Sequence, residues 1–237
     1  MYGFSEPGGT GVVGESKTWM GVYGKTDSTT GGAGVMGEGA AGGPGVIGKS
    51  QTWHGVYGET VSCTGSVGVS ATGAGVYGKG GRVAAFFEGD VEVTGDLRLL
   101  NADCAEDFDV CDEADTDPGT VLVIGEDGRL RRRSVAYDPR VAGVVSGAGN
   151  YRPGLILDSR GHTTEPRRPI ALVGKTWCKV DASAAPIEVG ALLTTSDVPG
   201  HAMRATDQVR MMGSVIGKAL GSLTGGRGLV PILVALQ

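Results

Sequence analysis

The first part of the chain repeats a four-residue pattern in which two glycines enclose a valine and one further, usually large, side chain. The pattern starts at residues 11, 21, 34, 45, 55 and 75, with a degenerate copy at 65, so its spacing is 10 to 13 residues. A valine and one further residue between two glycines predict a very short β segment. Glycine permits a positive φ and a close backbone approach where the chain turns at each end of that segment. A unit this short cannot bury a core of its own, so we expect the repeats to be stabilised by stacking.

A longer unit is duplicated in the same region, because residues 11–26 and 45–60 are identical at 11 of 16 positions at an offset of 34. We therefore predict a glycine-rich repeat stalk over residues 1–82, either a single-chain β-solenoid or an interwound β-stalk of three chains. No cap is evident at Met1, so we expect a longer protein or another subunit to cover that end. In the interwound form the first apolar position of each repeat would face the common axis: Val12, Val22, Val35, Val46, Val56 and Val76.

The pattern changes after residue 82. Over residues 83–101, apolar and polar positions alternate, which predicts short strands in a β-linker or neck. Residues 102–237 show no convincing amphipathic helix, and glycine- and proline-containing turns separate their apolar segments. The predicted fold class is all-β, with a compact β-barrel or sandwich-like head. We expect strands over residues 120–124, 129–133, 141–146, 170–180, 191–195, 214–220 and 229–236.

Composition supports this division and excludes several function classes. Glycine supplies 44 of 237 residues and is densest before Gly95, whereas its usual share is about 7%. The net charge of −5 and isoelectric point of about 5.2 argue against nucleic-acid binding. No apolar run approaches the roughly 20 residues of a membrane span. Four scattered cysteines do not form a disulfide framework; Cys104 and Cys111 could pair, but we expect free thiols.

Two stretches resemble known phage proteins. Residues 87–97 (FEGDVEVTGDL) look like the stalk-to-head passage of phage tail-fibre and tail-spike proteins. Much of the head is similar to the C-terminal region of phage neck-appendage and tail-spike proteins that includes a self-cleaving intramolecular chaperone. The segments that carry this similarity are 101–110, 141–147, 187–199, 215–220 and 230–236.

This resemblance implies a homotrimeric structural fibre or spike subunit of a virion tail or of an extracellular phage-like particle. Such a subunit would attach to a cell-surface receptor or glycan, or cap the fibre, with other particle subunits at its N-terminal end. One alternative is a self-cleaving chaperone domain for trimer assembly. Another is a self-assembling extracellular filament, in which the uncapped repeat of one trimer stacks on the head of the next.

Self-cleavage would act near the junction between stalk and head. Asn101 could break its own peptide bond by cyclising, and Cys104 or Ser134 could act as a nucleophile. The segment DCAEDF at residues 103–108 departs from the pattern closer to DYAEYF that the resemblance leads us to expect. We therefore expect an uncut chain and no conventional enzyme active site.

Two further groups of residues could bind ligands. The aromatic side chains Trp19, Tyr23, Trp53, Tyr57 and Tyr77 could form an exposed stripe that stacks on sugars, or they could pack between chains. Three copies of His54 could also meet on a trimer axis.

Residues 103–117 hold eight acids and no base. Their carboxylates could bind calcium, and the candidates are Asp109, Asp112, Asp115 and Asp117. The alternative, which we favour, is a solvated acidic segment that pairs across chains with the arginines of residues 129–133. We expect no metal and no cofactor.

Overall fold

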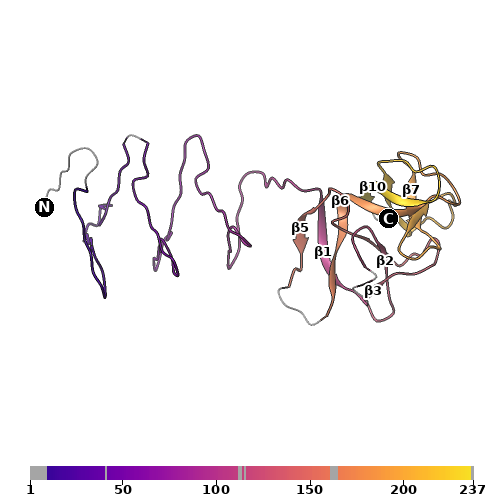
Figure 1. Ribbon diagram of the computed structural model, residues 1–237, viewed down its shortest axis with the longest axis horizontal. Helices are drawn as coiled ribbons and strands as arrows, with labels where there is room; N and C mark the ends of the chain where they lie inside the picture. Colours follow the sequence, from indigo (N-terminus) through magenta and orange to yellow (C-terminus); the bar gives the residue numbers. More distant parts are fainter. Residues whose placement is uncertain (1–9, 41, 112–113, 115, 161–164, 236–237) are drawn as a thin grey trace. The chain divides into compact units, whose positions relative to one another are not determined.

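The computed structural model describes residues 10–40, 42–111, 114, 116–160 and 165–235 (Figure 1). The chain divides into two compact units, Met1–Asp90 and Val91–Gln237. We call residues 10–90 the repeat region and residues 91–237 the head. No helix occurs among the described residues, and every assigned strand lies in the head. The chain is therefore all-β, as the sequence predicts.

The described part of the head contains ten strands, which are named here in chain order. They are β1 (Asp103–Asp109), β2 (Val121–Ile124), β3 (Leu130–Arg131), β4 (Val141–Val145), β5 (Pro153–Leu157), β6 (Arg167–Asp181), β7 (Leu192–Thr195), β8 (Ala202–Arg204), β9 (Val215–Ala219) and β10 (Arg227–Ala235).

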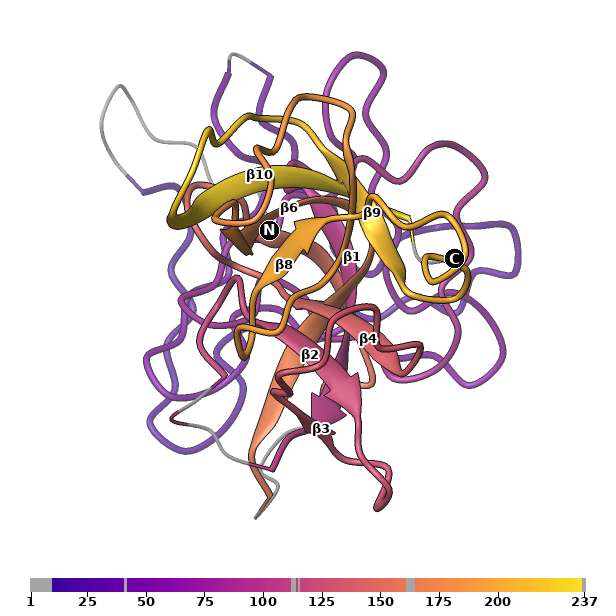
Figure 2. The ribbon, with the colours of Figure 1, turned by 90° about the vertical axis from the view of Figure 1, so that its right-hand side faces the viewer.

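Five of these strands close into a β-barrel. The order runs from β10 through β9, β7 and β8 to β6, and β6 pairs again with β10. Figure 2 shows β6, β8, β9 and β10 of this barrel. The closing ladder is antiparallel and extends from Arg227 opposite Asp181 to Ala235 opposite Val173. Closure removes the exposed edges that an open sheet of the same strands would present.

The long strand β6 connects the barrel to a second layer of strands. Its first half pairs with β1 and β4, and its second half forms the barrel ladder with β10. Outside the barrel, β2 and β3 continue from β4, and β5 pairs in parallel with β1. Gly174 lies where these layers meet, with φ +110°, and a Cβ there would lie 2.6 Å from the carbonyl oxygen of Ala102.

Alternation of inward and outward residues builds the core. In β10, Val230, Ile232 and Val234 are buried, whereas Leu229 and Leu233 between and beside them are exposed. This period of two is what a half-buried strand requires. The barrel core also takes residues from β6, β7 and β9, and a smaller cluster fills the space around β2 and β4: Val110, Leu122, Leu130, Val145 and Ile170.

The sequence predicts β2, β3, β4, β6, β7, β9 and β10 within three residues of their observed ends, but it misses β1, β5 and β8. The sequence does not predict β1 because this segment is acidic, and acidic residues are depleted in strands. It forms nevertheless, because β5 and β6 satisfy its backbone from both sides. Only its alternate residues Asp103 and Ala105 turn fully inward.

The short strands predicted over residues 83–101 are not present. Only isolated bends are assigned among these residues. A strand requires a hydrogen-bonded neighbour, and the described chain supplies none there.

The repeat region forms no assigned strand among its described residues; it makes a series of back-and-forth loops (Figure 1). Each loop has a narrow neck in which the last glycine of one repeat lies against the first glycine of the next. A Cβ added to Gly48 would lie 2.0 Å from the carbonyl oxygen of Gly55, and one added to Gly68 would lie 2.4 Å from that of Gly75.

Of the two roles expected for the glycines, these necks confirm the close backbone approach but not the positive φ. None of the described glycines of the four-residue pattern has a positive φ. Glycine is needed at these positions because two backbone segments approach closely there, and a side chain would prevent that approach.

Candidate functional site

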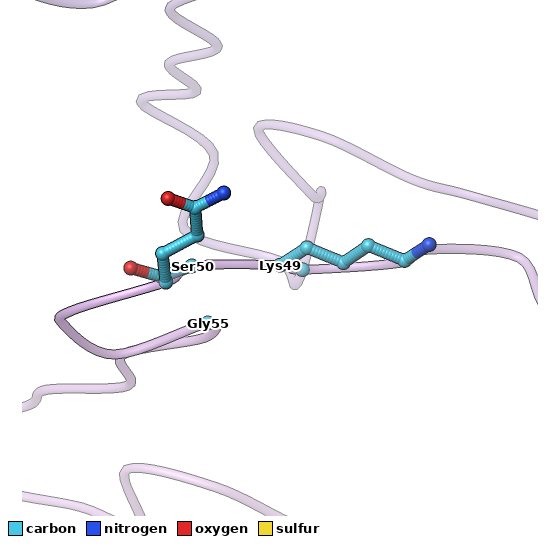
Figure 3. A pocket seen from close by; sticks show the side chains of 5 residues that line it. Lys49, Ser50 and Gly55 are labelled. Carbon is cyan, nitrogen blue, oxygen red and sulfur yellow. The ribbon is translucent and has the colours of Figure 1, made fainter.

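Two equivalent loops of the repeat region display a tryptophan. In the loop 49–54 the hydroxyl of Ser50 accepts a hydrogen bond from the Trp53 backbone N–H at 3.0 Å. Ser16 does the same for Trp19 at 3.2 Å in the duplicated loop 15–20. Figure 3 shows Lys49, Ser50 and Gly55 on the second loop, with the chain turning between Ser50 and Gly55. The duplication in sequence is thus a duplication of a local turn.

All five aromatic residues of the predicted stripe are exposed in the single chain, by 70 to 82%. They belong to successive loops and necks of the repeat region. Among the described residues of this region, ring contacts join Trp53 to His54, with centroids 5.5 Å apart, and His54 to Tyr57, at 5.8 Å. Each loop therefore offers its own aromatic surface, and an assembly would decide whether it stays exposed.

A second aromatic site lies in the head, around the connection between β4 and β5. The rings of Tyr151 and Trp177 have centroids 6.1 Å apart at an interplanar angle of 42°. The indole N–H of Trp177 donates to the side-chain oxygen of Asn150 at 2.9 Å. The Lys175 ammonium lies over the Tyr151 ring, 5.4 Å from its centroid.

Beside these residues is a hollow of about 210 Å³, lined by Leu100, Asn101, Ala102, Asn150, Tyr151, Arg152 and Lys175. We call it the Tyr151 hollow. All of its walls come from the head. Its lining residues thus include two with amide side chains, two with cationic side chains and one with a phenol ring.

The Arg152 side chain folds back on the loop that carries Tyr151. Arg152 donates hydrogen bonds to the carbonyl oxygens of Gly147, Gly149 and Tyr151 at 2.6, 3.1 and 2.7 Å. Gly149 has φ +59°, and a Cβ there would lie 2.7 Å from the Trp177 ring. Only glycine fits that position comfortably, on grounds of both conformation and space.

The sequence contains a signal for Trp177 that our prediction of a strand over 170–180 did not use. Along β6, Lys175, Trp177 and Lys179 alternate with buried Thr176 and Cys178. Residues two apart in a strand share a face, so the tryptophan stands on the outer face between two lysines. The approach of Tyr151 and Asn150 could not be read from the sequence, because it depends on the path of a distant loop.

The three autocleavage candidates are not brought together. Asn101 lines the Tyr151 hollow, and Cys104 lies on β1 opposite Val173. Ser134 is exposed in the connection between β3 and β4. Among the described residues we find no contact that joins any two of these three side chains.

The acidic cluster likewise separates into individual ion pairs. Asp117 contacts Lys179 at 2.6 Å and Asp109 contacts Arg167 at 3.5 Å, while Asp112 and Asp115 lie outside the described residues. The lysine hydrogen bond lowers the pKa of Asp117. No group of acidic, histidine or cysteine residues suited to a metal ion occurs in the described part of the chain.

The arginines of residues 129–133 also have partners other than the acidic segment within this chain. Arg129 pairs with Glu165 at 2.8 Å, and Arg131 pairs with Asp127. That these arginines pair with the acidic segment of another chain stays a prediction from the sequence.

Cysteines and one buried acid complete the chemically notable groups. Cys63, Cys104, Cys111 and Cys178 are free thiols, and burial raises the pKa of Cys178 to about 12, which keeps it protonated and unreactive. Asp103 is buried and accepts hydrogen bonds from the Ser146 hydroxyl at 2.7 and 2.9 Å. Burial is the main reason that the pKa of Asp103 is raised.

No family model matches this sequence, and no curated protein matches it. The described residues contain no helix that is long and apolar enough to cross a membrane.

Proposed function

We propose that this chain is a structural fibre or spike subunit of a phage tail or an extracellular phage-like particle. It assembles as a homotrimer, in which three repeat regions wind around one axis. The assembly attaches the particle to a cell-surface receptor or glycan, or caps the fibre, and other particle subunits join its N-terminal end.

One observation carries the proposal: the valine that opens each repeat is exposed by 59 to 80% in the single chain. A regular row of exposed valines is costly in water, since a fully buried valine gains about 1.5–3 kcal/mol over an exposed one. No strand is assigned in the described repeat region, so its backbone groups are also open to pairing with another chain. Neighbouring copies of the same chain would cover the valines.

The head offers a second surface for association. β5 pairs only with β1 among the described strands, and its consecutive residues Leu155, Ile156 and Leu157 are exposed by 38 to 43%. Consecutive strand residues point to opposite faces, so this edge strand is apolar on both sides. Apolar edge strands of this kind favour pairing with another chain.

The test is the molar mass of the purified full chain by light scattering, together with a denatured mass spectrum of the same sample. We expect a particle of three chains of 24.0 kDa each and an intact chain in the spectrum. A monomer would refute the interwound assembly and leave a single-chain solenoid.

The same data separate the two alternatives from the proposal. Two fragments that divide near Asn101 would support the self-cleaving chaperone. A mass that rises steadily with protein concentration would support the filament, because head-to-tail contacts do not close.

A further inference from the structure

We propose that the Tyr151 hollow binds a single sugar ring that carries an anionic group, either a carboxylate or a phosphate. The inference rests on the proposed attachment function and specifies the ligand class and the residues that recognise it. It moves sugar recognition from the aromatic residues of the repeat region to the head.

The charge of the hollow favours an anion. Arg152 and Lys175 line it, and none of its described lining residues is acidic. Lys175 is exposed and has no carboxylate partner among the described residues. Arg152 is occupied with three carbonyl oxygens. Lys175 is therefore the group expected to contact the anionic substituent, because an ammonium can reorient its three donors toward it.

The remaining walls suit the body of a sugar. The Tyr151 ring supplies a flat apolar surface, and an aromatic residue combines such a surface with a polar tip. The amides of Asn101 and Asn150 each offer both donors and acceptors for ring hydroxyls. The volume of about 210 Å³ is below the about 300–1,000 Å³ typical of sites for drug-sized ligands. One sugar ring is the scale of ligand that this space accepts.

The site is also organised before any ligand arrives. Arg152 fixes the carbonyl groups of the loop, and the Trp177 ring lies directly under Gly149. The Trp177 indole holds Asn150 by a hydrogen bond. A site that is rigid in advance loses less entropy on binding. Trp177 is thus a positioning residue, whereas Tyr151 and Lys175 contact the ligand.

The experiment uses the full chain and four probes: D-glucuronate, D-glucose 6-phosphate, D-glucose and inorganic phosphate. Binding is followed by ligand-observed saturation-transfer NMR and by titration at low ionic strength. We expect glucuronate or glucose 6-phosphate to bind at least tenfold more tightly than glucose and than inorganic phosphate. The stronger of the two identifies the anionic group as a carboxylate or a phosphate.

Variants assign the roles within the site. Lys175→Gln should reduce binding of the preferred acidic sugar at least tenfold and leave glucose binding unchanged. Tyr151→Ala should reduce both at least fivefold. Trp177→Phe keeps a ring under the loop but loses the hydrogen bond to Asn150, so it should weaken both sugars by a similar, smaller factor. Lys218→Gln, at an exposed lysine of β9, is the matched control and should change nothing.

Several results would overturn the inference. These are equal binding of inorganic phosphate and acidic sugar, full binding by Lys175→Gln, or no binding of either acidic sugar. Loss of binding in a Trp19→Ala, Trp53→Ala variant with an intact head would place recognition in the repeat region instead. Molar mass measured on the same samples keeps the two proposals apart: a trimer that binds no sugar refutes only the site, and a monomer that binds refutes only the assembly.

Discussion

The repeat region and the head use valine in opposite ways. In the head, Val144 and Val180 are fully buried and Val230 is 2% exposed, whereas in the repeat region Val56 and Val76 are 75% and 80% exposed. Both regions place valine in short extended segments. The head pairs these segments with each other, so it completes its core within one chain. The repeat region leaves them without strand partners among the described residues. An apolar pattern therefore specifies which face of a segment is apolar, but not which part of which chain covers that face.

The largest effect is expected when the apolar row is removed from the repeat region. Replacing Val46, Val56 and Val76 together by aspartate should reduce the trimer to a monomer, because three charges per chain would lie where the chains meet. The melting temperature of the head should change little, as these residues contribute nothing to its core. Light scattering and circular dichroism measure the two effects on one sample. A trimer that survives this triple substitution would contradict the interwound arrangement.

A core substitution in the head should have the reverse effect. Ile232 is fully buried in the barrel, and Ile232→Ala should lower the free energy of unfolding of the head by about 2–5 kcal/mol. Chemical denaturation followed by circular dichroism measures the change. Val56→Ala is the matched control and should leave the head transition in place. Equal shifts from both substitutions would mean that the two regions do not unfold separately.

A smaller effect is expected at the glycine necks. Gly48→Ala would force a Cβ to within 2.0 Å of the Gly55 carbonyl oxygen, whereas a Cβ on Gly81 meets nothing within 4 Å. Gly48→Ala should therefore destabilise the assembled repeat region by about 1–3 kcal/mol, the usual cost of overpacking. Gly81→Ala should be nearly neutral. The midpoint of urea-induced dissociation measures both, and equal midpoints would show that the close approach of the necks is not required.

The smallest effect concerns the buried carboxyl of the head. Burial raises the pKa of Asp103 above its ordinary 3.8, so the folded state holds this proton more tightly than the unfolded state does. The contribution of Asp103 to stability is full below pH 3.8 and is lost as the pH rises through the folded-state pKa. Asparagine does not titrate, so Asp103→Asn removes this loss. The melting temperature of the variant minus that of the unmodified protein should therefore increase from pH 3.5 to about pH 7.

Asp117→Asn provides a control of opposite sign. The Lys179 hydrogen bond lowers the pKa of Asp117, so its stabilisation is present above pH 3.8 and is lost as the pH falls through the folded-state pKa. The melting temperature of this variant relative to the unmodified protein should fall over the same rise in pH. Parallel curves for the two variants would show that burial does not govern Asp103.

Local periodicity accounts for the parts of the fold that the sequence predicts. The alternation over 227–235 places Val230, Ile232 and Val234 on one face, whatever packs against them. The spacing of the glycines likewise identifies the repeat, and the duplicated residues 11–26 and 45–60 form equivalent turns at Ser16 and Ser50. Each of these features depends on residues that are close in the chain.

The amino-acid pattern alone is enough to fix the all-β class, the glycine repeat and the outward face of Trp177, because strand period and glycine spacing are local properties. Only the tertiary structure decided that the acidic segment Asp103–Asp109 becomes β1, that β6 closes the barrel on β10, and that Tyr151 meets Trp177. These outcomes depend on which edges and loops meet across long separations in the chain. A segment whose composition disfavours a strand can still form one when two neighbouring strands satisfy its backbone hydrogen bonds.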